Sequence, residues 1–497
     1  MRRPMLRSFC LFVGLTATAC VDNAPVAPRD ATTRGPSFAI SSPAAHGGAN
    51  RHIVTFSGAM PANFESQVAA LGGQVLWSAP DAGLAAVRGL SSAGAAALGS
   101  TVGVQSVDAD VLLSLPLPKL AAPDAASPDG LASNTNPAAA VRFPLQWNMV
   151  AVHADAAWAA GFLGSPDVSV YMLDSGIDYL HADLVGRVDL ARSVDILGSY
   201  YHFLDNGDSV LVTEADTVAK YFPTRLPITD LFFHGTHTSA TASSNAVRAA
   251  GITSMTRLVA VKVCSYLDEC PFSSILGGVI YGAQHKAGVM NLSLGGSFPK
   301  KGNRHLIKLI NAVFEYATLR GVTIVVSAGN EATDLDHDPT NYHAFCDTPG
   351  VICVAATGPT AQVSPFGPWT DVDAPAYYTN FGRRAIDVAA PGGNNDVTFV
   401  YAACSQTSLY LAQLGILCSN LSVIGAEGTS MAAPHVSGTA ALLVSLLGRR
   451  PDAIKERIEE TADNVGGFAL RAFYGHGRLN VYQAVTQRDY AHDKHDW

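Results

Sequence analysis

The stretch EGTSMAAPHVSG, residues 427–438, combines a reactive residue type with the start of a buried helix. The small and apolar residues that continue it predict a helix that packs closely on every side. Pro434 has no N–H with which to bond the Ser430 carbonyl, which is harmless only in the first turn of a helix. We therefore expect the helix to begin at residues 430–433, with Ser430 at its positive end. A serine that only caps the helix would sit at the same place, so this stretch alone leaves both roles open.

Upstream of this helix, apolar strands alternate with helices. Strands are predicted at 168–173, 257–263, 322–328 and 351–356, and helices at 273–288 and 305–321. Because the strands are continuous apolar runs, we expect both faces of their sheet to be covered. The fold class is therefore α/β, with a largely parallel, doubly wound sheet and helices on both faces. In such a sheet, functional residues gather at the carboxyl ends of the strands.

Residues 51–115 have a different pattern. Their predicted order is strand, amphipathic helix, strand, short helix and strand, which indicates a small α+β sandwich. Linkers rich in Pro, Ala and Ser precede this unit at 21–50 and follow it at 116–143. The main domain would then span 144–487, followed by a short tail at 488–497.

Residues 1–20 have the composition of a secretory signal peptide. Basic residues precede an apolar stretch that is shorter than the roughly 20 residues of a membrane span, and small residues precede Cys20. We expect cleavage after Ala17-Thr18-Ala19 and secretion. A lipoprotein signal, with lipid on Cys20 and anchoring at the cell envelope, is the alternative. The net charge of −9 offers no basic surface for nucleic acid.

Six of the eight cysteines lie beyond the signal. An even number of cysteines in an exported chain indicates disulfides. No CxxC or Cys/His spacing points to a metal instead. Among the alternative connectivities we favour the sequence-local pairs Cys264–Cys270, Cys346–Cys353 and Cys404–Cys418.

Four polar residues stand where a strand or a Gly-rich turn leads into the next element. Asp174 follows a predicted strand in the turn DSG, and Asn330 follows another strand after a glycine. His234 begins a helix of small residues, HGTHTSATA. Each has an ordinary explanation alone, as a turn or capping residue. Together with Ser430 they form the set that nucleophilic catalysis requires: a serine, a base, a carboxylate to orient the base, and oxyanion donors.

A zinc site is the competing interpretation of this histidine segment. His234 and His237 are three residues apart and could share a helix face. The glutamate of an HExxH metalloprotease is missing, and no third ligand stands at an informative spacing, so we disfavour zinc.

With these residues in view, residues 145–486 resemble the subtilisin-like serine proteases, or subtilases. The main matching blocks are VYMLDSGIDYLHADL around Asp174, HGTHTSATA around His234, VVSAGNE around Asn330 and GTSMAAPHVSG around Ser430. Further matching segments are MNLSLGG, YTNFGRRAIDVAAPGG and YGHGRLNVYQAV. The resemblance implies a subtilisin-like sheet and hydrolysis of peptide bonds through an acyl-enzyme.

The resemblance also implies a role for each of the four residues. Ser430 would be the nucleophile and His234 the general base and later the general acid. Asp174 would hold the imidazole in its productive tautomer. The Asn330 side chain and the Ser430 N–H would bind the oxyanion.

Further residues match family positions outside this quartet. The segment Ser293, Leu294, Gly295 and Gly296 would line the primary specificity pocket, and its glycines would admit a sizeable apolar side chain. Asp183 matches a frequent calcium ligand, although the ligand loop around it is not recognisable, and the chemistry itself needs no cofactor.

Residues 51–115 resemble the subtilase propeptide, a ferredoxin-like folding helper and inhibitor, although an inert N-terminal domain is the alternative. Maturation cleavage would fall after about residue 113, in the linker 116–143. The partners expected are protein or peptide substrates and the chain's own propeptide, with no transmembrane span and a monomeric enzyme.

The chain also departs from the family pattern. Thr238, Ser239 and Ala240 replace a commoner Val-Ala-Gly after the second histidine. Insertions near 195–231, 359–376 and 394–424 are expected to form surface loops around the cleft.

Three other functions compete with the peptidase. An exported, non-catalytic binding module on the same fold is opposed by the intact quartet. An α/β-hydrolase esterase would need the order Ser, Asp, His and a GxSxG elbow. The sedolisin relatives use Glu and Asp where this chain has His234 and Asn330.

Overall fold

The computed structural model describes residues 51–115, 118–123, 135–203, 209–467 and 470–487. The predicted signal peptide, Cys20, the first linker and the C-terminal tail lie outside these ranges.

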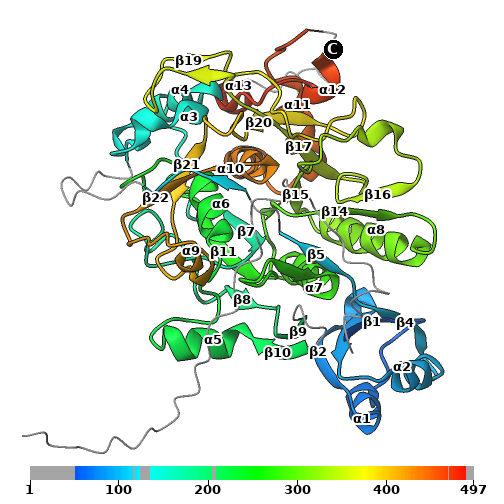
Figure 1. The fold of residues 1–497 in the computed structure, drawn as a ribbon. Coiled ribbons are helices and arrows are strands. Elements are labelled where there is room, and N and C mark those ends of the chain that lie inside the picture. Colours follow the sequence, from blue (N-terminus) through cyan, green and yellow to red (C-terminus); the bar gives the residue numbers. More distant parts are fainter. Residues whose placement is uncertain (1–50, 116–117, 124–134, 204–208, 468–469, 488–497) are drawn as a thin grey trace, which may run out of the picture. The chain divides into compact units, whose positions relative to one another are not determined.

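Seven parallel strands form the central sheet, in the order β20-β17-β15-β13-β7-β11-β8 (Figure 1). Their bounds are β7 Ser169–Asp174, β8 Val194–Asp195, β11 Arg257–Lys262, β13 Val289–Leu292, β15 Thr323–Ser327, β17 Val351–Thr357 and β20 Val388–Pro391. Except for the edge strand β8 and for Arg257 at the start of its neighbour β11, these strands are buried at every residue. The predicted parallel sheet is thus confirmed, although β8, β13 and β20 were too short to be predicted as strands.

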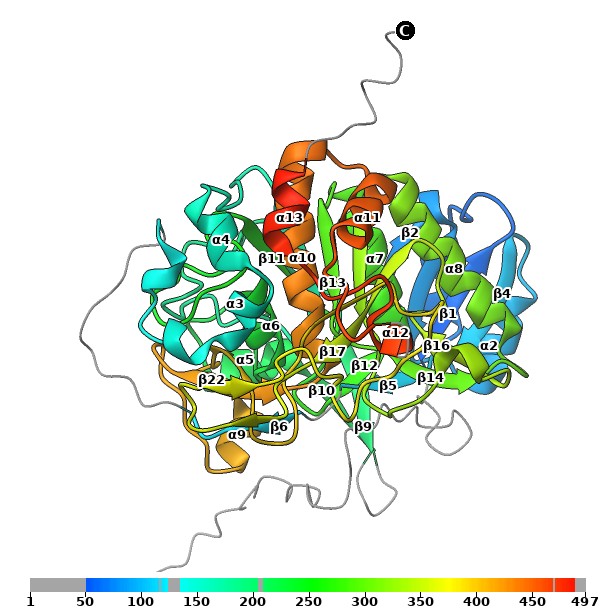
Figure 2. The ribbon, with the colours of Figure 1, turned by 90° about the horizontal axis from the view of Figure 1, so that it is seen from above.

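Helices cover both faces of this sheet (Figure 2). In β7, Val170 and Met172 point into the apolar cluster that includes α10 (Thr429–Leu447), while Tyr171 and Leu173 point into the cluster of α7 (Phe272–Gln284) and α8 (Arg304–Leu319). The helix α6 (His234–Ala242) packs against α10. Smaller helices complete the described part of the domain: α3 Trp147–Ala151, α4 Ala154–Ala159, α11 Pro451–Glu460, α12 Arg471–Tyr474 and α13 Val481–Thr486.

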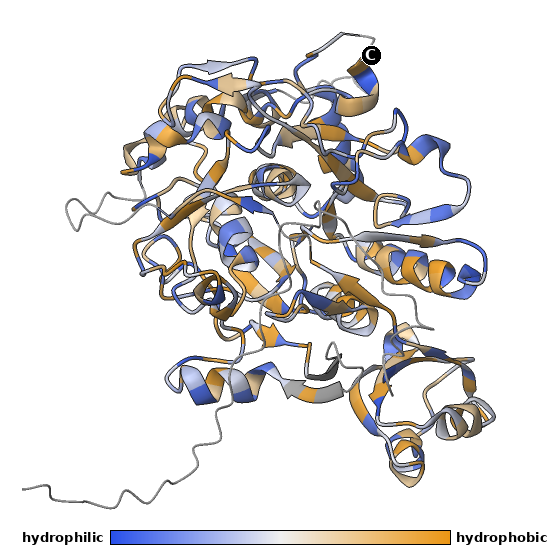
Figure 3. Ribbon diagram, in the orientation of Figure 1, coloured by the Kyte–Doolittle hydropathy of each residue, from blue (hydrophilic) through white to orange (hydrophobic). Residues whose placement is uncertain are grey.

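The helix α10 is the core of the domain. Within the described ranges, it alone has the length and hydropathy of a membrane span, and 83% of its most apolar window is buried inside the protein. Hydrophobic residues accordingly concentrate in the central strands and helices, whereas the peripheral α5 (Glu214–Tyr221) carries several hydrophilic ones (Figure 3).

Residues 51–109 form a four-stranded antiparallel sheet in the order β2-β3-β1-β4. Its elements are β1 Arg51–Phe56, α1 Phe64–Ala70, β2 Gln74–Ala79, β3 Leu84–Arg88, α2 Ser92–Gly99 and β4 Val104–Ala109. One face packs on α1 and α2, and the other contributes Ile53, Leu84 and Trp77 to the cluster that contains α7. The predicted α+β sandwich is present. The strand β2 was missed because most of its side chains are only partly buried, which leaves no clear alternation in the sequence.

Glycines let α7 pack closely on two sides. A Cβ at Gly277 would lie 2.8 Å from the Trp77 ring, whereas one at Gly278 would lie 3.0 Å from Leu173 and Val263 of the central sheet. The N-terminus of this helix is capped from the other unit, because Asp110 accepts from Ser273 N at 2.9 Å.

Three disulfides join Cys264–Cys270, Cys346–Cys353 and Cys404–Cys418. The insertions contain short elements of their own. The described parts of 195–231 include β9 Ser199–Phe203, β10 Ser209–Thr213 and α5; 359–376 holds β18 Ala361–Gln362 and β19 Trp369–Thr370; and 394–424 holds β21 Val400–Ala403 and α9 Leu409–Gln413.

Candidate active site

The predicted residues meet at one edge of the central sheet. Asp174 is the last residue of β7, Ser293 directly follows β13, and Asn330 follows β15. These three strands are adjacent and parallel, so their carboxyl ends lie side by side. The helices α6 and α10 begin with His234 and Thr429, and α10 is linked to this edge through contacts of Ser430 with Ser293.

Asp174 and His234 form a buried pair. The Nδ1 atom of His234 lies 2.8 and 3.0 Å from the two carboxylate oxygens of Asp174, and neither side chain is exposed. Asp174 also accepts from the backbone N–H of Ser175 at 2.7 Å and from the Thr238 hydroxyl at 3.1 Å. The departure from the family at Thr238 therefore supplies a further hydrogen bond to this carboxylate. Since Asp174 holds Nδ1, a neutral His234 presents its Nε2 lone pair to the opposite side.

Two glycines permit this close approach. A Cβ at Gly235 would lie 2.1 Å from the carbonyl oxygen of Gly176, so only glycine fits where the first turn of α6 meets the turn after β7. Gly176 itself has a φ of +111°. The glycines beside Asp174 and His234 are thus required by packing.

Asp230 anchors the start of α6 and is absent from the residues predicted from the sequence. Its carboxylate accepts from the N–H groups of Phe232, Phe233 and Thr236 at 2.9, 3.0 and 2.9 Å, and from the Ser175 hydroxyl at 2.9 Å. Burial raises the pKa of Asp230, while the hydrogen bonds from Thr236 oppose that rise. An aspartate shortly before a predicted helix is a capping signal that could have found it.

Phe233 holds an unusual backbone conformation directly before His234. Its φ is +135°, which a bulky side chain rarely adopts. The hydrogen bond from its N–H to Asp230 and the stacking of its ring on Tyr410, with centroids 6.1 Å apart, hold it there. The aspartate therefore positions both the strained residue and the histidine that follows it.

Ser430 and Ser293 are joined by two reciprocal hydrogen bonds. The Ser430 hydroxyl donates to the Ser293 carbonyl at 3.0 Å, and the Ser293 hydroxyl donates to the Ser430 carbonyl at 2.8 Å. The observed start of α10 differs from the predicted one. The helix begins at Thr429, one residue before the predicted range, and Pro434 lies inside it. The carbonyl that Pro434 cannot serve is satisfied by Ser293 instead.

Asn330 is oriented by the residue before Ser430. Its Oδ1 atom accepts from both the N–H and the hydroxyl of Thr429, each at 2.9 Å. The Nδ2 group is thereby turned toward the start of α10, where it lies 3.5 Å from the point that a Cβ would occupy at Gly428. The N–H of Ser430, at the second position of α10, belongs to the donors that a helix leaves unpaired. Two donors thus lie at the same end of the helix.

Within the described residues, Nε2 of His234 has no hydrogen-bond partner although it is buried. A buried polar atom without a partner is costly, and such atoms gather at functional sites. The Ser430 hydroxyl points to Ser293, so the hydrogen bond between Ser430 and His234 is not formed in this conformation.

A model of the subtilase family, Peptidase_S8, matches residues 165–477, which is more than half of the chain and contains all four residues. The chain belongs to the subtilase family.

Named relatives of this subtilase are serine proteases. A thermophilic serine proteinase from Bacillus sp. (strain AK1) is 32% identical over 337 residues, which is 67% of this chain and 65% of that protein. The match thus spans just under two thirds of the relative's length. Thermitase from Thermoactinomyces vulgaris is 28% identical over 319 residues, which is 64% of this chain and 88% of that protein.

Solved structures share the subtilase fold. The epidermin leader peptide processing serine protease of Staphylococcus aureus has a TM-score of 0.62 at 18% identity, covering 88% of this chain and 99% of its own. Fervidolysin from Fervidobacterium pennivorans has a TM-score of 0.59 at 20% identity, covering 92% of this chain and 62% of its own. At these identities the likeness concerns the fold alone.

A small pocket opens beside the candidate site of this subtilase. The residues that line it include Gly295 and Gly296, residues 327–329, Glu331, His343 and Cys346. Gly295 and Gly296 of the predicted specificity segment thus line this pocket together with polar residues. Ser293 lies instead against Ser430, and Leu294 is buried in the core.

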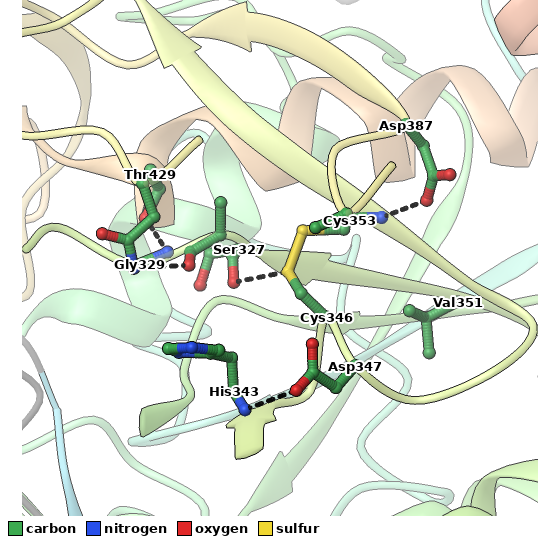
Figure 4. The surroundings of a disulfide bond; sticks show 12 residues. Ser327, Gly329, His343, Cys346, Asp347, Val351, Cys353, Asp387 and Thr429 are labelled. Carbon is green, nitrogen blue, oxygen red and sulfur yellow. Dashed lines mark hydrogen bonds between the residues drawn. A yellow bond between two sulfur atoms is a disulfide. The ribbon is translucent and has the colours of Figure 1, made fainter. Parts of the chain in front are cut away.

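The Cys346–Cys353 disulfide supports one wall of this pocket (Figure 4). Cys346 Sγ lies 3.8 Å from the Ser327 carbonyl, and Asp387 accepts from Cys353 N at 2.8 Å. His343 is held by its N–H, which donates to Asp347 at 2.9 Å.

Two segments of the chain itself flank the site. The strand β5 (Leu112–Ser114) pairs antiparallel with β12 (Glu269–Pro271), and Leu115 N donates to the Asp268 carbonyl at 2.8 Å. On the far side, β6 (Lys119–Leu120) pairs antiparallel with β22 (Val423–Glu427), the strand that leads into Ser430 (Figure 2). The chain thus approaches Ser430 from both sides.

Asp183 is surrounded by hydrogen-bond donors. Its carboxylate accepts from the N–H groups of Val247, Arg248 and Ala249 at 2.8, 2.7 and 3.1 Å. Across the described part of the chain, no three His, Cys, Asp or Glu side chains are arranged to hold a metal. The three N–H groups engage both carboxylate oxygens, as in a carboxylate that caps a turn.

Two further buried histidines have structural partners. His237 bonds the Val400 carbonyl through Nε2 at 3.0 Å. His435 donates from Nδ1 to the Met431 carbonyl and accepts at Nε2 from Asn148, both at 2.9 Å. Burial lowers the pKa of each to about 4, so both are neutral at neutral pH. No zinc-like convergence of His234 and His237 is found among the described residues.

The bond from Ser293 to the Ser430 carbonyl yields a double-mutant prediction. In an inactive His234→Ala chain, Ser293→Ala should reduce the free energy of unfolding by about 1–3 kcal/mol, because a buried carbonyl loses its donor. In a Pro434→Ala chain, residue 434 regains an N–H for that carbonyl, and the loss should be smaller by about 1 kcal/mol or more. Equal losses in the two chains, measured by urea unfolding, would show that Ser293 does not replace the bond missing at Pro434.

The neutral histidines yield a pH prediction. Because their folded pKa lies below the ordinary value of about 6.5, the unfolded chain binds more protons between pH 4 and 6.5, and stability falls as the pH drops through this window. Each histidine should contribute about 3 kcal/mol to this loss in the Ser430→Ala chain. His435→Gln should remove one such contribution and leave that of His237 in place. A His435→Gln chain with the same pH dependence as its parent would contradict the assignment.

Proposed function

We propose that this subtilase is a serine endopeptidase that uses Asp174, His234 and Ser430 as its triad. The observation that carries the proposal is the buried Asp174–His234 pair, whose free Nε2 atom lies at the sheet edge where α10 presents Ser430. Asn330 and the Ser430 N–H would form the oxyanion hole.

In the proposed reaction, the Ser430 side chain first rotates away from the Ser293 carbonyl. His234 Nε2 then takes the hydroxyl proton while Ser430 Oγ attacks the scissile carbonyl carbon. The carbonyl oxygen becomes an oxyanion that accepts from Asn330 Nδ2 and from the Ser430 N–H.

Collapse of this intermediate breaks the C–N bond, and His234 gives its proton to the departing amine. Water, deprotonated by His234, then attacks the acyl-enzyme and regenerates the Ser430 hydroxyl. Asp174 stabilises the imidazolium in both halves, with Ser175 and Thr238 fixing the carboxylate.

We further propose that residues 51–115 act as an inhibitory propeptide and that residues 144–487 are the mature peptidase domain. The antiparallel pairing of β5 with β12 and of β6 with β22 supports this proposal, since an extended peptide on either side of Ser430 excludes other substrates. We expect the maturation cut between Leu115 and Pro118, close to the site expected from the sequence.

The proposed substrates are proteins or peptides, bound in part by residues 293–296. The predicted signal peptide and the three disulfides support secretion, with lipid on Cys20 as the alternative.

Processing of the full chain tests the peptidase directly. The wild-type chain should be cut between Leu115 and Pro118 and should hydrolyse peptides, because the triad activates Ser430. Ser430→Ala should stay uncut there, and peptide hydrolysis should fall by about 10⁴-fold or more. Mass spectrometry of the mature N-terminus and a quenched-peptide assay measure the two effects.

Ser445→Ala is the matched control, since it removes a hydroxyl from the same helix far from its N-terminus. This control should process and hydrolyse as the wild type does. Equal processing of the folded Ser430→Ala and wild-type chains would assign the cut to another protease. Equal peptide hydrolysis would refute the proposed nucleophile.

A further inference from the structure

An acidic group of side chains lies at the end of β22, whose last residue, Glu427, stands three positions before Ser430. The group consists of Asp396, Tyr377 and Glu427. The Tyr377 hydroxyl lies 2.9 Å from Asp396 Oδ1 and 3.0 Å from Glu427 Oε1, while Asp396 N donates to Glu427 Oε2 at 3.1 Å. Asp396 comes from the insertion 394–424, and Tyr377 directly follows the insertion 359–376.

A cationic side chain already occupies this group. Lys119 Nζ forms an ion pair with Asp396 and lies 5.4 Å from the centre of the Tyr377 ring. Its backbone is held independently, because Lys119 is paired with Glu427 in the β6–β22 ladder and Ala121 N donates to the Gly425 carbonyl at 2.9 Å. The lysine is therefore presented by a docked strand.

The two residues of β6 face different surroundings. Lys119 contacts the acidic group, whereas Leu120 packs into the apolar cluster that contains Ala426 and Met431. Successive side chains of a strand point to opposite faces, so the register of a docked peptide decides which side chain meets Asp396.

The charge of this group at neutral pH resides on Asp396. Burial, followed by the neighbouring Asp396, raises the pKa of Glu427 to about 8, so Glu427 is largely protonated. Partial burial opposes ionisation of Asp396, but hydrogen bonds from Glu427, Lys119 and Tyr377 lower its pKa overall. One ionised carboxylate, Asp396, beside the aromatic ring of Tyr377 can bind a single ammonium or guanidinium group.

The pairing of β5 with β12 and of β6 with β22 indicates whether this group contacts substrate residues before or after the scissile bond. Residues 112–115 lie along β12, and residues 119–121 lie along β22, the strand that leads into Ser430. A peptide in the same path places the residues that follow its scissile bond against β22. We propose that Asp396, Tyr377 and Glu427 form a subsite that selects a lysine or arginine side chain two to four residues after the bond that is cut. This inference rests on the proposed peptidase function, and Lys119 is the first occupant of the subsite.

Cleavage of peptide sets by the matured enzyme tests the subsite. The enzyme is matured from the full Lys119→Ala chain, so that its own lysine does not compete. Quenched peptides carry lysine, its uncharged analogue norleucine, or glutamate at the second, third or fourth residue after the cut. At one of these positions, kcat/KM should be about three- to fivefold higher for lysine than for norleucine, and lowest for glutamate, as expected for a partly exposed ion pair.

Two variants assign that preference to Asp396. Asp396→Asn should bring the ratio of lysine to norleucine to about one, and asparagine tolerates the φ of +58° at this position. Asp452→Asn changes the net charge equally at an exposed position on α11 and should keep the full preference. Raising the salt concentration to about 1 M should also reduce the preference in the Lys119→Ala enzyme with Asp396 left intact, because salt screens the ion pair.

Failure of the subsite is distinct from failure of the peptidase. If norleucine peptides are cleaved but lysine gives no advantage at any of the three positions, the subsite is refuted and the peptidase stands. A preference that survives in Asp396→Asn, or that does not respond to salt, refutes it as well. If the enzyme cleaves no peptide at all, the proposed function itself fails.

Discussion

The burial of α10 against the middle of a parallel sheet is the constraint on which the rest of the structure depends. A helix enclosed along its length must consist of small and apolar residues, and its first turn must emerge where the strands end. That position brings the free donors of the helix N-terminus next to the residues that follow β7, β13 and β15. Ser293 then serves the carbonyl that Pro434 leaves unpaired, so the helix start and the sheet edge are locked together.

The same edge is also where peptides can dock. β12 and β22 each offer backbone groups on one side of Ser430, and the chain's own residues 112–115 and 119–121 take both positions. Backbone pairing of this kind accepts many sequences, and selectivity must come from the side chains around it. The pocket beside Gly295 lies on one side of the site, and Asp396 on the other. Asp396 belongs to the insertion 394–424, whereas Gly295 and Gly296 lie in a segment that matches the family pattern.

Much of this organisation follows from the sequence, because it depends on residue types that have few alternatives. Long apolar runs predicted the central strands. Asp174 and Asn330 were identified as candidates because each follows one of these strands. The Gly-rich junctions marked these candidates, and the structure shows that Gly176 and Gly235 there approach each other closely. The three sequence-local cysteine pairs are bonded as favoured.

Features that depend on the fold as a whole could not be predicted in this way. The strand β2 becomes a strand by pairing with β3 and packing on α7, and its own pattern is weak. Asp230 acts through backbone N–H groups, whose positions a sequence does not give. The helix start was displaced because a distant serine, Ser293, replaces the bond that Pro434 lacks. Lys119 and Asp396 are 277 residues apart in the sequence, and they come into contact because β6 pairs with β22.

Covalent labelling with a fluorophosphonate probe tests the central claim, that this sheet edge activates Ser430, most directly. The matured wild-type enzyme should take up one phosphonate per chain, located by peptide mass spectrometry on Ser430. His234→Ala and Ser430→Ala should both remain unlabelled, because the first loses the base and the second the nucleophile. A correctly processed wild-type protein that is not labelled, or that carries the phosphonate on another serine, would contradict the account.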